Sequence, residues 1–306
     1  MTSPAAPTAS ADGISEASRG PVPRTLLTAL TPMAWGTTYI VTTELLPAGH
    51  PLFAGLLRAL PGGLIALALS RTLPRGAWWG KAAALGVLNI GLPFPLLFFA
   101  AERLPGGVAA TLAAAQPLVI ALLAVTVLRE ALSAWRLAWG VIGVFGVGLM
   151  VIGPNAAFDQ LGIAAALGSA VSMALGITLT KRWGRPGEAG PTAFAGWQLT
   201  AGGLCLLPVT FLAEGAPPVI DGTGAVGYLW MGLIGGLLSY TLWFRGVTTL
   251  PVTAVAVLLL LSPLVATALG AIVLDQRFGP LQLAGFGLSL AAIVAGQLPA
   301  PARYRR

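Results

Sequence analysis

Long apolar runs separated by short polar segments dominate the pattern along this chain. Each run is about 20 residues long with few or no charges, which is enough for a helix to cross a hydrocarbon layer roughly 30 Å thick. The ten runs are 26–45, 52–70, 80–100, 105–127, 136–153, 161–180, 193–213, 225–244, 251–274 and 280–298. The pattern therefore predicts an all-α integral membrane protein with ten transmembrane helices.

Composition supports the same class. Of the 306 residues, 56% are hydrophobic and only 9% are charged, too few to cover the surface of a water-soluble protein of this length. Residues 1–23 are rich in Pro, Ala, Ser and Thr and contain no apolar core, so we expect a disordered cytoplasmic tail there rather than a signal peptide. Residues 299–306 are expected to form a short basic cytoplasmic tail.

The basic residues predict the orientation, since Lys and Arg accumulate on the cytoplasmic side of membrane helices. With the N-terminus inside, fourteen of the 17 fall on cytoplasmic segments: Arg19, Arg24, Arg71, Arg75, Lys81, Arg129, Arg136, Lys181, Arg182, Arg185, Arg245, Arg303, Arg305 and Arg306. Only Arg103 and Arg277 fall outside, and Arg58 lies within the second run. We therefore expect a bacterial inner-membrane protein with both termini cytoplasmic.

The same distribution bears on partners. The cations are spread over several short segments and form no stripe, which argues against nucleic-acid binding. We expect them to contact anionic lipid on the cytoplasmic side of the bilayer. The small-residue run GVIGVFGVG, residues 140–148, could pack within the molecule or form a dimer seam. We favour packing within a monomer.

The chain also repeats itself. A shift of 146 residues places 96–138 on 242–284 with 14 identities in 43 positions, and a shift of 140 places LLRALPGGLIAL (56–67) on GWQLTAGGLCLL (196–207). We infer two five-helix repeats, residues 24–153 and 154–298. Because each repeat has an odd number of spans, the two must be inverted in the membrane. Inverted repeats are a recurrent architecture of secondary transporters, which bind substrate near the midplane between the halves.

Two prolines occupy equivalent positions in this repeat, Pro117 in the fourth span and Pro263 in the ninth. Proline removes a helix hydrogen bond, which is tolerated in a membrane only where protein or a polar cavity covers the freed carbonyl. Two explanations remain open. Either the prolines are packing kinks, or they are hinges in helices that line a transport pathway.

These motifs resemble a known family. The resemblance rests on three features: AWG (34–36), the pair ALPGGL and TAGGL in spans two and seven, and LP followed after eleven residues by PL (104–118 and 250–264). In these features the chain resembles the drug/metabolite transporter superfamily. Within it the chain resembles the ten-helix EamA-type exporters, and among these the aromatic amino acid exporters. The resemblance implies that spans 1, 3, 4, 6, 8 and 9 surround a central cavity that opens alternately to the two sides.

The polar residues exclude other functions. The single histidine, His50, lies in a loop, and the carboxylates fall in cytoplasmic segments or at or near the outside ends of spans, so none lies at mid-membrane. Enzymatic chemistry and a metal site are therefore not expected, no nucleotide-binding loop is present, and we expect no cofactor. A cation carrier would need a carboxylate at mid-membrane, so the substrate is expected to be neutral or zwitterionic. Glu44 is interpreted as a solvated residue at a helix end.

We expect a small-molecule substrate to bind between midspan aromatic and amide side chains, because aromatic rings stack on aromatic solutes. The candidate substrate-binding residues are Trp35, Tyr39, Asn89, Phe94, Phe98, Gln116, Ser239, Tyr240, Trp243 and Ser262. Phe94 and Tyr240 are repeat equivalents. Arg58 either reaches outward to solvent or a loop carboxylate, or recognises a substrate carboxylate with its planar fork of donors.

The sequence thus predicts a secondary exporter of small amphiphilic metabolites, with aromatic or other neutral amino acids as leading candidates. A multidrug carrier, a carrier of other metabolites, or a membrane scaffold or receptor that has retained the repeats are the alternatives.

The predicted orientation can be tested by labelling single cysteines with a membrane-impermeant reagent. Positions in 181–190 should react only after the cells are opened, because that segment is expected to be cytoplasmic. Positions in 214–223 should react in intact spheroplasts. The opposite pattern would overturn both the orientation and the inversion of the repeats.

Overall fold

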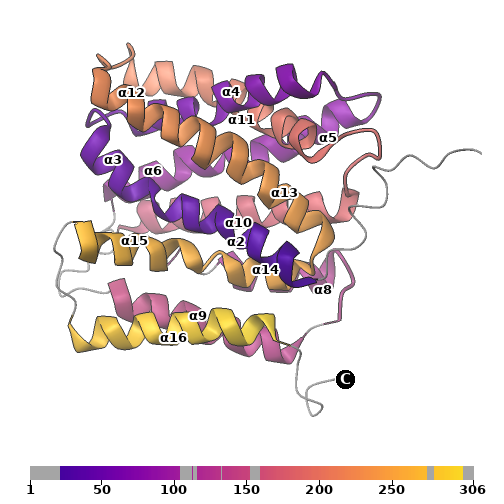
Figure 1. Cartoon of the computed structure of the whole chain (residues 1–306), viewed down its shortest axis with the longest axis vertical. Coiled ribbons are helices and arrows are strands. Elements are labelled where there is room, and N and C mark those ends of the chain that lie inside the picture. The colour runs from indigo at the N-terminus through magenta and orange to yellow at the C-terminus, as the bar shows by residue number, and fades with distance from the viewer. Residues whose placement is uncertain are drawn as a thin grey trace, which may run out of the picture.

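The computed structural model describes residues 21–103, 112, 116–131, 133–151, 159–273 and 279–298, and within these ranges the chain is helical with no strand. The helices lie side by side across a flattened bundle (Figure 1). The first repeat contains α2 (Pro21–Gly36), α3 (Thr38–Leu45), α4 (Pro51–Ser70), α5 (Trp78–Gly86), η2 (Val87–Gly91), α6 (Pro93–Arg103), α8 (Gln116–Thr126) and α9 (Ala134–Val151). The second contains α10 (Gln160–Trp183), α11 (Pro191–Glu214), α12 (Gly222–Leu229), η3 (Trp230–Leu238), α13 (Ser239–Thr249), α14 (Val252–Leu258), α15 (Leu261–Val273) and α16 (Pro280–Gln297).

All ten predicted spans have helical segments among the described residues, so the all-helical membrane fold is confirmed. Six helices there are long and apolar enough to cross a bilayer: Pro51–Ser70, Trp78–Leu97, Gln160–Trp183, Pro191–Glu214, Gly222–Thr249 and Val252–Val273. The other spans consist of α2 with α3, α8, α9 and α16. For the fourth span, only Leu112 and the part from Gln116 onward are among the described residues.

The first helix begins earlier than the sequence pattern predicts. The chain is already helical at Pro21, the first described residue, rather than from residue 26. The predicted tail, 1–23, therefore ends in three helical residues, and its remainder lies outside the described residues. The predicted basic tail, 299–306, also lies outside them.

Several spans are not continuous α-helices, which hydropathy does not predict. The first is interrupted at Thr37 and the ninth at Leu259 and Leu260, while η2 and η3 are π-helical segments inside spans three and eight. The break after Gly36 follows from close contact. A Cβ at Gly36 would lie 2.6 Å from both Ser262 O and Val265 Cβ, so α15 crosses at a distance that only glycine permits.

The contacts between helices follow the repeat: when each span is replaced by its equivalent in the other half, the same pairs of helices are in contact. Helix α4 packs on α11, α9 on α16 and α8 on α14, and in each pair the partners are equivalent spans of the two halves. The pairing of α2 with α13 matches that of α10 with α6, and the pairing of α2 with α15 matches that of α10 with α8. In Figure 1, α4 with α11 and α9 with α16 form opposite edges of the bundle. These matched pairs agree with two related five-helix repeats.

Paired glycines set the crossing of α4 and α11. A Cβ at Gly63 would lie 2.5 Å from Thr200 N, and one at Gly203 would lie 2.7 Å from Leu60 Cβ. Gly63 and Gly203 are equivalent at the 140-residue shift. Small residues let membrane helices approach until their backbones touch, which maximises the dispersion contacts that hold them together in lipid.

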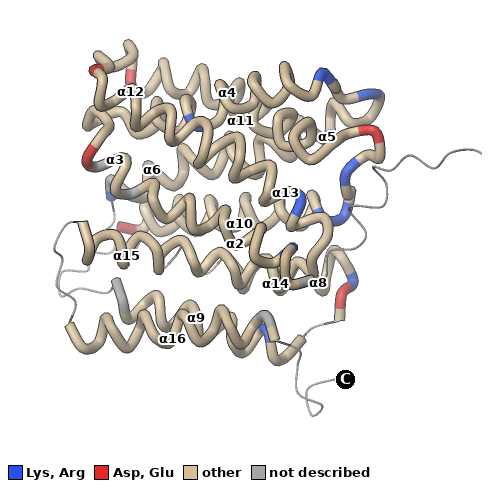
Figure 2. The backbone as a smooth tube through the Cα atoms, in the orientation of Figure 1, with Lys and Arg blue, Asp and Glu red and all other residues tan. Residues whose placement is uncertain are grey.

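Lys and Arg gather at one end of the bundle (Figure 2). We call the end where α4, α8 and α10 finish the basic end, since Arg71, Arg75, Arg129, Lys181 and Arg182 lie at these helix ends in the sequence and Arg75–Glu188 and Arg182–Val127 join them. The opposite end carries Glu44, Asp159, Glu214 and Asp221. There, Glu214 accepts hydrogen bonds from Leu52 N at 2.5 Å and Phe53 N at 2.9 Å, which joins the end of α11 to the start of α4. A carboxylate at this position satisfies N–H groups that have no helical acceptor.

The α4–α11 crossing generates a test. Gly63→Ala and Gly203→Ala should each lower the melting temperature of the purified protein, because overpacking a tight interface costs about 1–3 kcal/mol. The matched control is Gly287→Ala on α16, where a Cβ would meet nothing within 4 Å. Equal melting temperatures for the three variants in detergent would contradict so close a crossing.

Candidate functional site

The two π-helical segments occupy equivalent positions in the two repeats. The shift of 146 residues carries 87–91, which is η2, onto 233–237, inside η3. Each segment lies within its span, between α5 and α6 or between α12 and α13. π-Helical turns are rare and are found frequently at functional sites. The two halves therefore place irregular backbone at matched positions of spans three and eight.

In η3, the carbonyl of Gly235 accepts two side-chain hydrogen bonds from other spans. Trp35 Nε1 donates at 3.0 Å from α2, and Arg58 Nε donates at 3.3 Å from α4. Gly235 itself is buried. One backbone oxygen thus joins spans one, two and eight at a single point.

Arg58 lies between two aromatic rings. Its Cζ is 5.6 Å from the ring centroid of Trp35 and 5.6 Å from that of Phe94, a distance typical of cation–π contacts. Within the described residues, the two terminal nitrogens of its guanidinium have no hydrogen-bond or ion-pair partner. The side chain is partly buried and points to neighbouring spans rather than to a loop carboxylate. A cation with free donors therefore stands inside the bundle.

Aromatic rings continue from this point into the second half. The Trp35 ring centroid lies 5.1 Å from Tyr240 and 5.3 Å from Trp243, both tilted rather than parallel. Tyr240 and Trp243 are buried on α13. Phe94 and Tyr240, the predicted repeat equivalents, thus flank the Trp35–Arg58 pair from opposite halves.

Ser239 has a supporting position. Its carbonyl accepts a 2.8 Å hydrogen bond from Thr31 Oγ1, and its own Oγ donates to Ile234 O at 2.6 Å. The first bond joins α2 to α13, and the second stays within span eight. Because its hydroxyl is already engaged with its own helix, Ser239 orients the aromatic residues rather than presenting a free donor.

The equivalent position in the other half holds an uncharged contact. Asn89 in η2 is the repeat equivalent of Gly235, and Gln198 in α11 is the repeat equivalent of Arg58. Asn89 Nδ2 donates to Gln198 Oε1 at 2.9 Å, and both side chains are fully buried. The inverted repeats thus form a contact at two equivalent positions. At one of them Arg58 donates to the carbonyl of Gly235, and at the other the two amides of Asn89 and Gln198 are paired.

We define the Arg58 cluster as Trp35, Arg58, Phe94, Gly235, Tyr240 and Trp243. Four of the ten candidate substrate residues lie in it: Trp35, Phe94, Tyr240 and Trp243. Asn89 lies in the equivalent contact. The side chains of Tyr39 and Phe98 lie outside the described residues.

Gln116 and Ser262, the pair that precedes the two prolines, are not joined to the Arg58 cluster by any contact of the described residues. Gln116 is 8% exposed, and its Nε2 has no hydrogen-bond partner. A buried unpaired amide costs free energy, so such a group is a natural point for a ligand or water to bind.

Pro263 does not lie in the middle of a continuous helix. It is the third residue of α15, which starts after the break at Leu259 and Leu260. In a first helical turn proline forfeits no helical hydrogen bond. The interruption that the sequence pattern assigns to Pro263 therefore lies just before it. Pro117 lies in α8 next to residues 113–115, which are outside the described residues.

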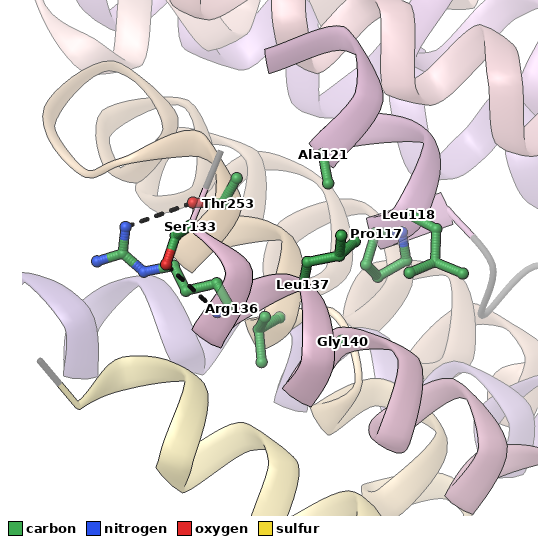
Figure 3. A pocket seen from close by; sticks show the side chains of 9 residues that line it. Pro117, Leu118, Ala121, Ser133, Arg136, Leu137, Gly140 and Thr253 are labelled. Atoms are coloured by element: carbon green, nitrogen blue, oxygen red, sulfur yellow. Dashed lines mark hydrogen bonds between the residues drawn. The ribbon is translucent and has the colours of Figure 1, made fainter. Parts of the chain in front are cut away.

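A pocket beside Pro117 is too small for a metabolite. It lies among α8, α9 and α14, with Leu137, Gly140 and Arg136 on one side and Thr253 on another (Figure 3). Its volume is about 10 Å³, which is room for one water molecule. We exclude it from the candidate site.

Pattern reasoning missed Gly235 and Thr31. Gly235 contributes a carbonyl, which hydropathy and residue type do not reveal, although the 146-residue shift that pairs it with Asn89 is visible in the sequence. Thr31 donates to a backbone oxygen of another span, and nothing in its neighbourhood distinguishes it from other threonines in membrane helices.

Comparison with known proteins gives consistent matches. Residues 24–152 and 160–295 each match the model of the EamA-like transporter family. Protein PecM of Dickeya dadantii (strain 3937) is 42% identical over 266 residues, covering 87% of this chain and 89% of that protein. The WAT1-related protein At3g02690, chloroplastic, of Arabidopsis thaliana is 28% identical over 87% of this chain and 67% of that one. A crystal structure with 20% identity has a TM-score of 0.78 and covers 91% of this chain and 97% of that chain, so it shares the fold.

The amide pair provides a test of the repeat-equivalent contact. Asn89→Leu and Gln198→Leu should each lower the melting temperature, because each leaves a buried amide without its main partner, at a cost of about 1–3 kcal/mol. The double variant should recover part of the loss, since replacing both partners with apolar groups removes the unpaired atom. Losses in the double variant equal to the sum of the single ones would contradict a direct bond.

Proposed function

Since this chain belongs to the EamA-like transporter family, we propose that it is a secondary transporter that exports small amphiphilic metabolites, with aromatic and other neutral amino acids as leading substrates. The observation that carries the proposal is Arg58, which stands between Trp35 and Phe94 with two terminal nitrogens free of partners among the described residues. An amphiphilic solute would meet an anion-binding group and ring surfaces in one place.

The chemistry of the cluster favours a carboxylate beside an aromatic or apolar group. A guanidinium offers paired N–H donors that match the two oxygens of a carboxylate. Around it, Trp35 and Tyr240 offer faces and edges for a ring at typical aromatic distances. A neutral amino acid carries both the carboxylate and the apolar side chain. Among the described residues no carboxylate contacts the cluster, which disfavours a cationic drug as substrate.

Transport would follow from alternating access between the two halves. The site joins spans one, two, three and eight, so it includes elements of both repeats, as in other inverted-repeat transporters. The interruptions at Thr37 and before Pro263 supply places where a span can change direction, and with Pro117 they are the proposed hinges. The two states need to lie within a few kcal/mol of each other.

We further propose that the basic end faces the cytoplasm of a bacterial inner membrane, with both chain termini there. The support is the gathering of Lys and Arg at one end of the bundle, which is the usual signature of the cytoplasmic side. Under this orientation export runs from the basic end to the end that carries Glu44, Glu214 and Asp221. The packing of α9 on α16 within one chain favours a monomer.

Substrate flux tests the proposal. The protein in liposomes should move labelled phenylalanine or tryptophan faster than empty vesicles do. Arg58→Gln should fold, because the equivalent position already holds Gln198, and it should lower the affinity for the amino acid about tenfold or more, since a hydrogen bond to a charged group contributes about 1.5–3 kcal/mol.

Arg75→Gln is the matched control. It removes one arginine from the exposed Arg75–Glu188 pair at the basic end, which is not part of the Arg58 cluster. This variant should leave flux unchanged. Flux that Arg58→Gln does not affect would refute carboxylate recognition by Arg58. No flux of either amino acid by a folded protein would refute the proposed substrates and favour another metabolite or a non-transporting scaffold or receptor.

A further inference from the structure

A second cavity lies at the basic end, away from the Arg58 cluster. Its volume is about 630 Å³, within the range of small-molecule sites in proteins. It is formed where α8 and α10 both end. The lining residues are Thr126, Val127, Leu128, Arg129, Glu130, Lys181 and Arg182.

The lining is strongly basic. Arg129, Lys181 and Arg182 face one carboxylate, Glu130, so the cavity carries an excess of two positive charges. The ion pairs of the described residues are Arg75–Glu188 and Arg103–Asp159, and neither includes a cavity residue. The three cations are therefore not neutralised by a salt bridge within the described part of the chain.

Two of the cations are held in place by backbone carbonyls. Lys181 Nζ donates to Leu250 O at 2.7 Å and to Thr248 O at 3.4 Å. Arg182 donates from one terminal nitrogen to Val127 O at 3.1 Å. These bonds compensate carbonyls at helix ends, where a cation is favourable, and they leave further donors on both side chains.

Arg129 is different. It is exposed, and its side chain forms no hydrogen bond or ion pair with a described residue. Its φ of +56° is in the left-handed region, which non-glycine residues rarely adopt. Arg129 thus contributes a free guanidinium beside the anchored Lys181 and Arg182.

The protein surface next to the cavity is apolar. On α8, Leu122 is 63% exposed and Val125 is 40% exposed. On α10, Val171 is 41% exposed and lies eleven residues, or about three turns, before Arg182, so the two share a helix face. In a membrane protein such faces contact lipid acyl chains. The cavity is therefore bordered by exposed apolar residues on α8, whereas on α10 the exposed Val171 lies about 16 Å along the helix from Arg182.

We propose that this cavity binds the phosphate head group of an anionic phospholipid. Arg129 and Arg182 would bind the phosphate oxygens, and the acyl chains would lie along the apolar faces of α8 and α10. A water-soluble anion would use the cations but not the adjoining apolar surface, which is why the lipid is the favoured source of the phosphate. Basic pockets between membrane helices at the cytoplasmic surface are known sites for such head groups. Through the bonds of Lys181 to the 248–250 turn, the lipid would also tie span four to spans six and eight.

The purified protein in neutral detergent tests the site. Phosphatidylglycerol should raise the melting temperature by several degrees, whereas phosphatidylcholine and inorganic phosphate at equal concentration should not. Arg129→Gln/Arg182→Gln should lose this shift. The control, Arg71→Gln/Arg75→Gln, removes the same charge from the same end outside the cavity and should keep it.

Arg129→Gln alone guards against misfolding of the double variant, because the Arg129 side chain forms no hydrogen bond or ion pair with a described residue. In native mass spectrometry, this single variant should retain fewer bound phosphatidylglycerol molecules than the wild type. Three results would overturn the proposal: an undiminished shift in the cavity variants, an equal loss in the control, or an equal shift with inorganic phosphate. The measurement needs no substrate, so its failure is separable from failure of the transport proposal.

Discussion

The constraint on which this structure depends is that no backbone N–H or C=O group can face lipid without a partner. Regular helices satisfy it everywhere except at their interruptions, and the described interruptions lie where other helices cover them. Thr37 follows Gly36, which touches α15. The segment before Pro263 is buried, with Leu258 and Leu260 each no more than 2% exposed. In η3, side chains of α2 and α4 supply donors to Gly235 O. The interruptions of the helices therefore lie where helices pack closely, and one of them, η3, forms part of the candidate site.

The inverted repeat explains why the site takes its form. A contact between a polar side chain of the second span in one half and the π-helical segment of the third span in the other half occurs twice, once from each half. In one direction it is Asn89 with Gln198, buried and fully uncharged. In the other it is Gly235 with Arg58. Since the amide pair joins the equivalent helices without a charge, the cation is not required for that packing.

The sequence alone predicts the large-scale structure. The length of the spans, the uneven distribution of Lys and Arg and the internal repeat each depend on many residues together, so no single position decides them. Ten spans, two halves and the pairing of Gly62-Gly63 with Gly202-Gly203 could all be derived from it. The aromatic candidates Trp35, Phe94, Tyr240 and Trp243 could also be derived, since aromatic rings at midspan are few. What could not be predicted was how they meet. The Arg58 contact depends on a carbonyl in η3, and the π-helical turns that shift such carbonyls depend on packing between distant spans rather than on local composition.

Arg58 has an electrical consequence. Its guanidinium lies inside the bundle with no counter-ion among the described residues. One elementary charge that crosses the full membrane potential changes energy by about 2.3 kcal/mol per 100 mV, comparable to the free-energy difference between two conformations in exchange. Any step that displaces Arg58 along the membrane normal therefore couples the conformational equilibrium to voltage, by the fraction of the field it crosses. A zwitterionic amino acid adds no net charge, so the loaded carrier would respond to the potential as the empty one does, whereas a substrate with a carboxylate and no ammonium would cancel the charge and abolish the response.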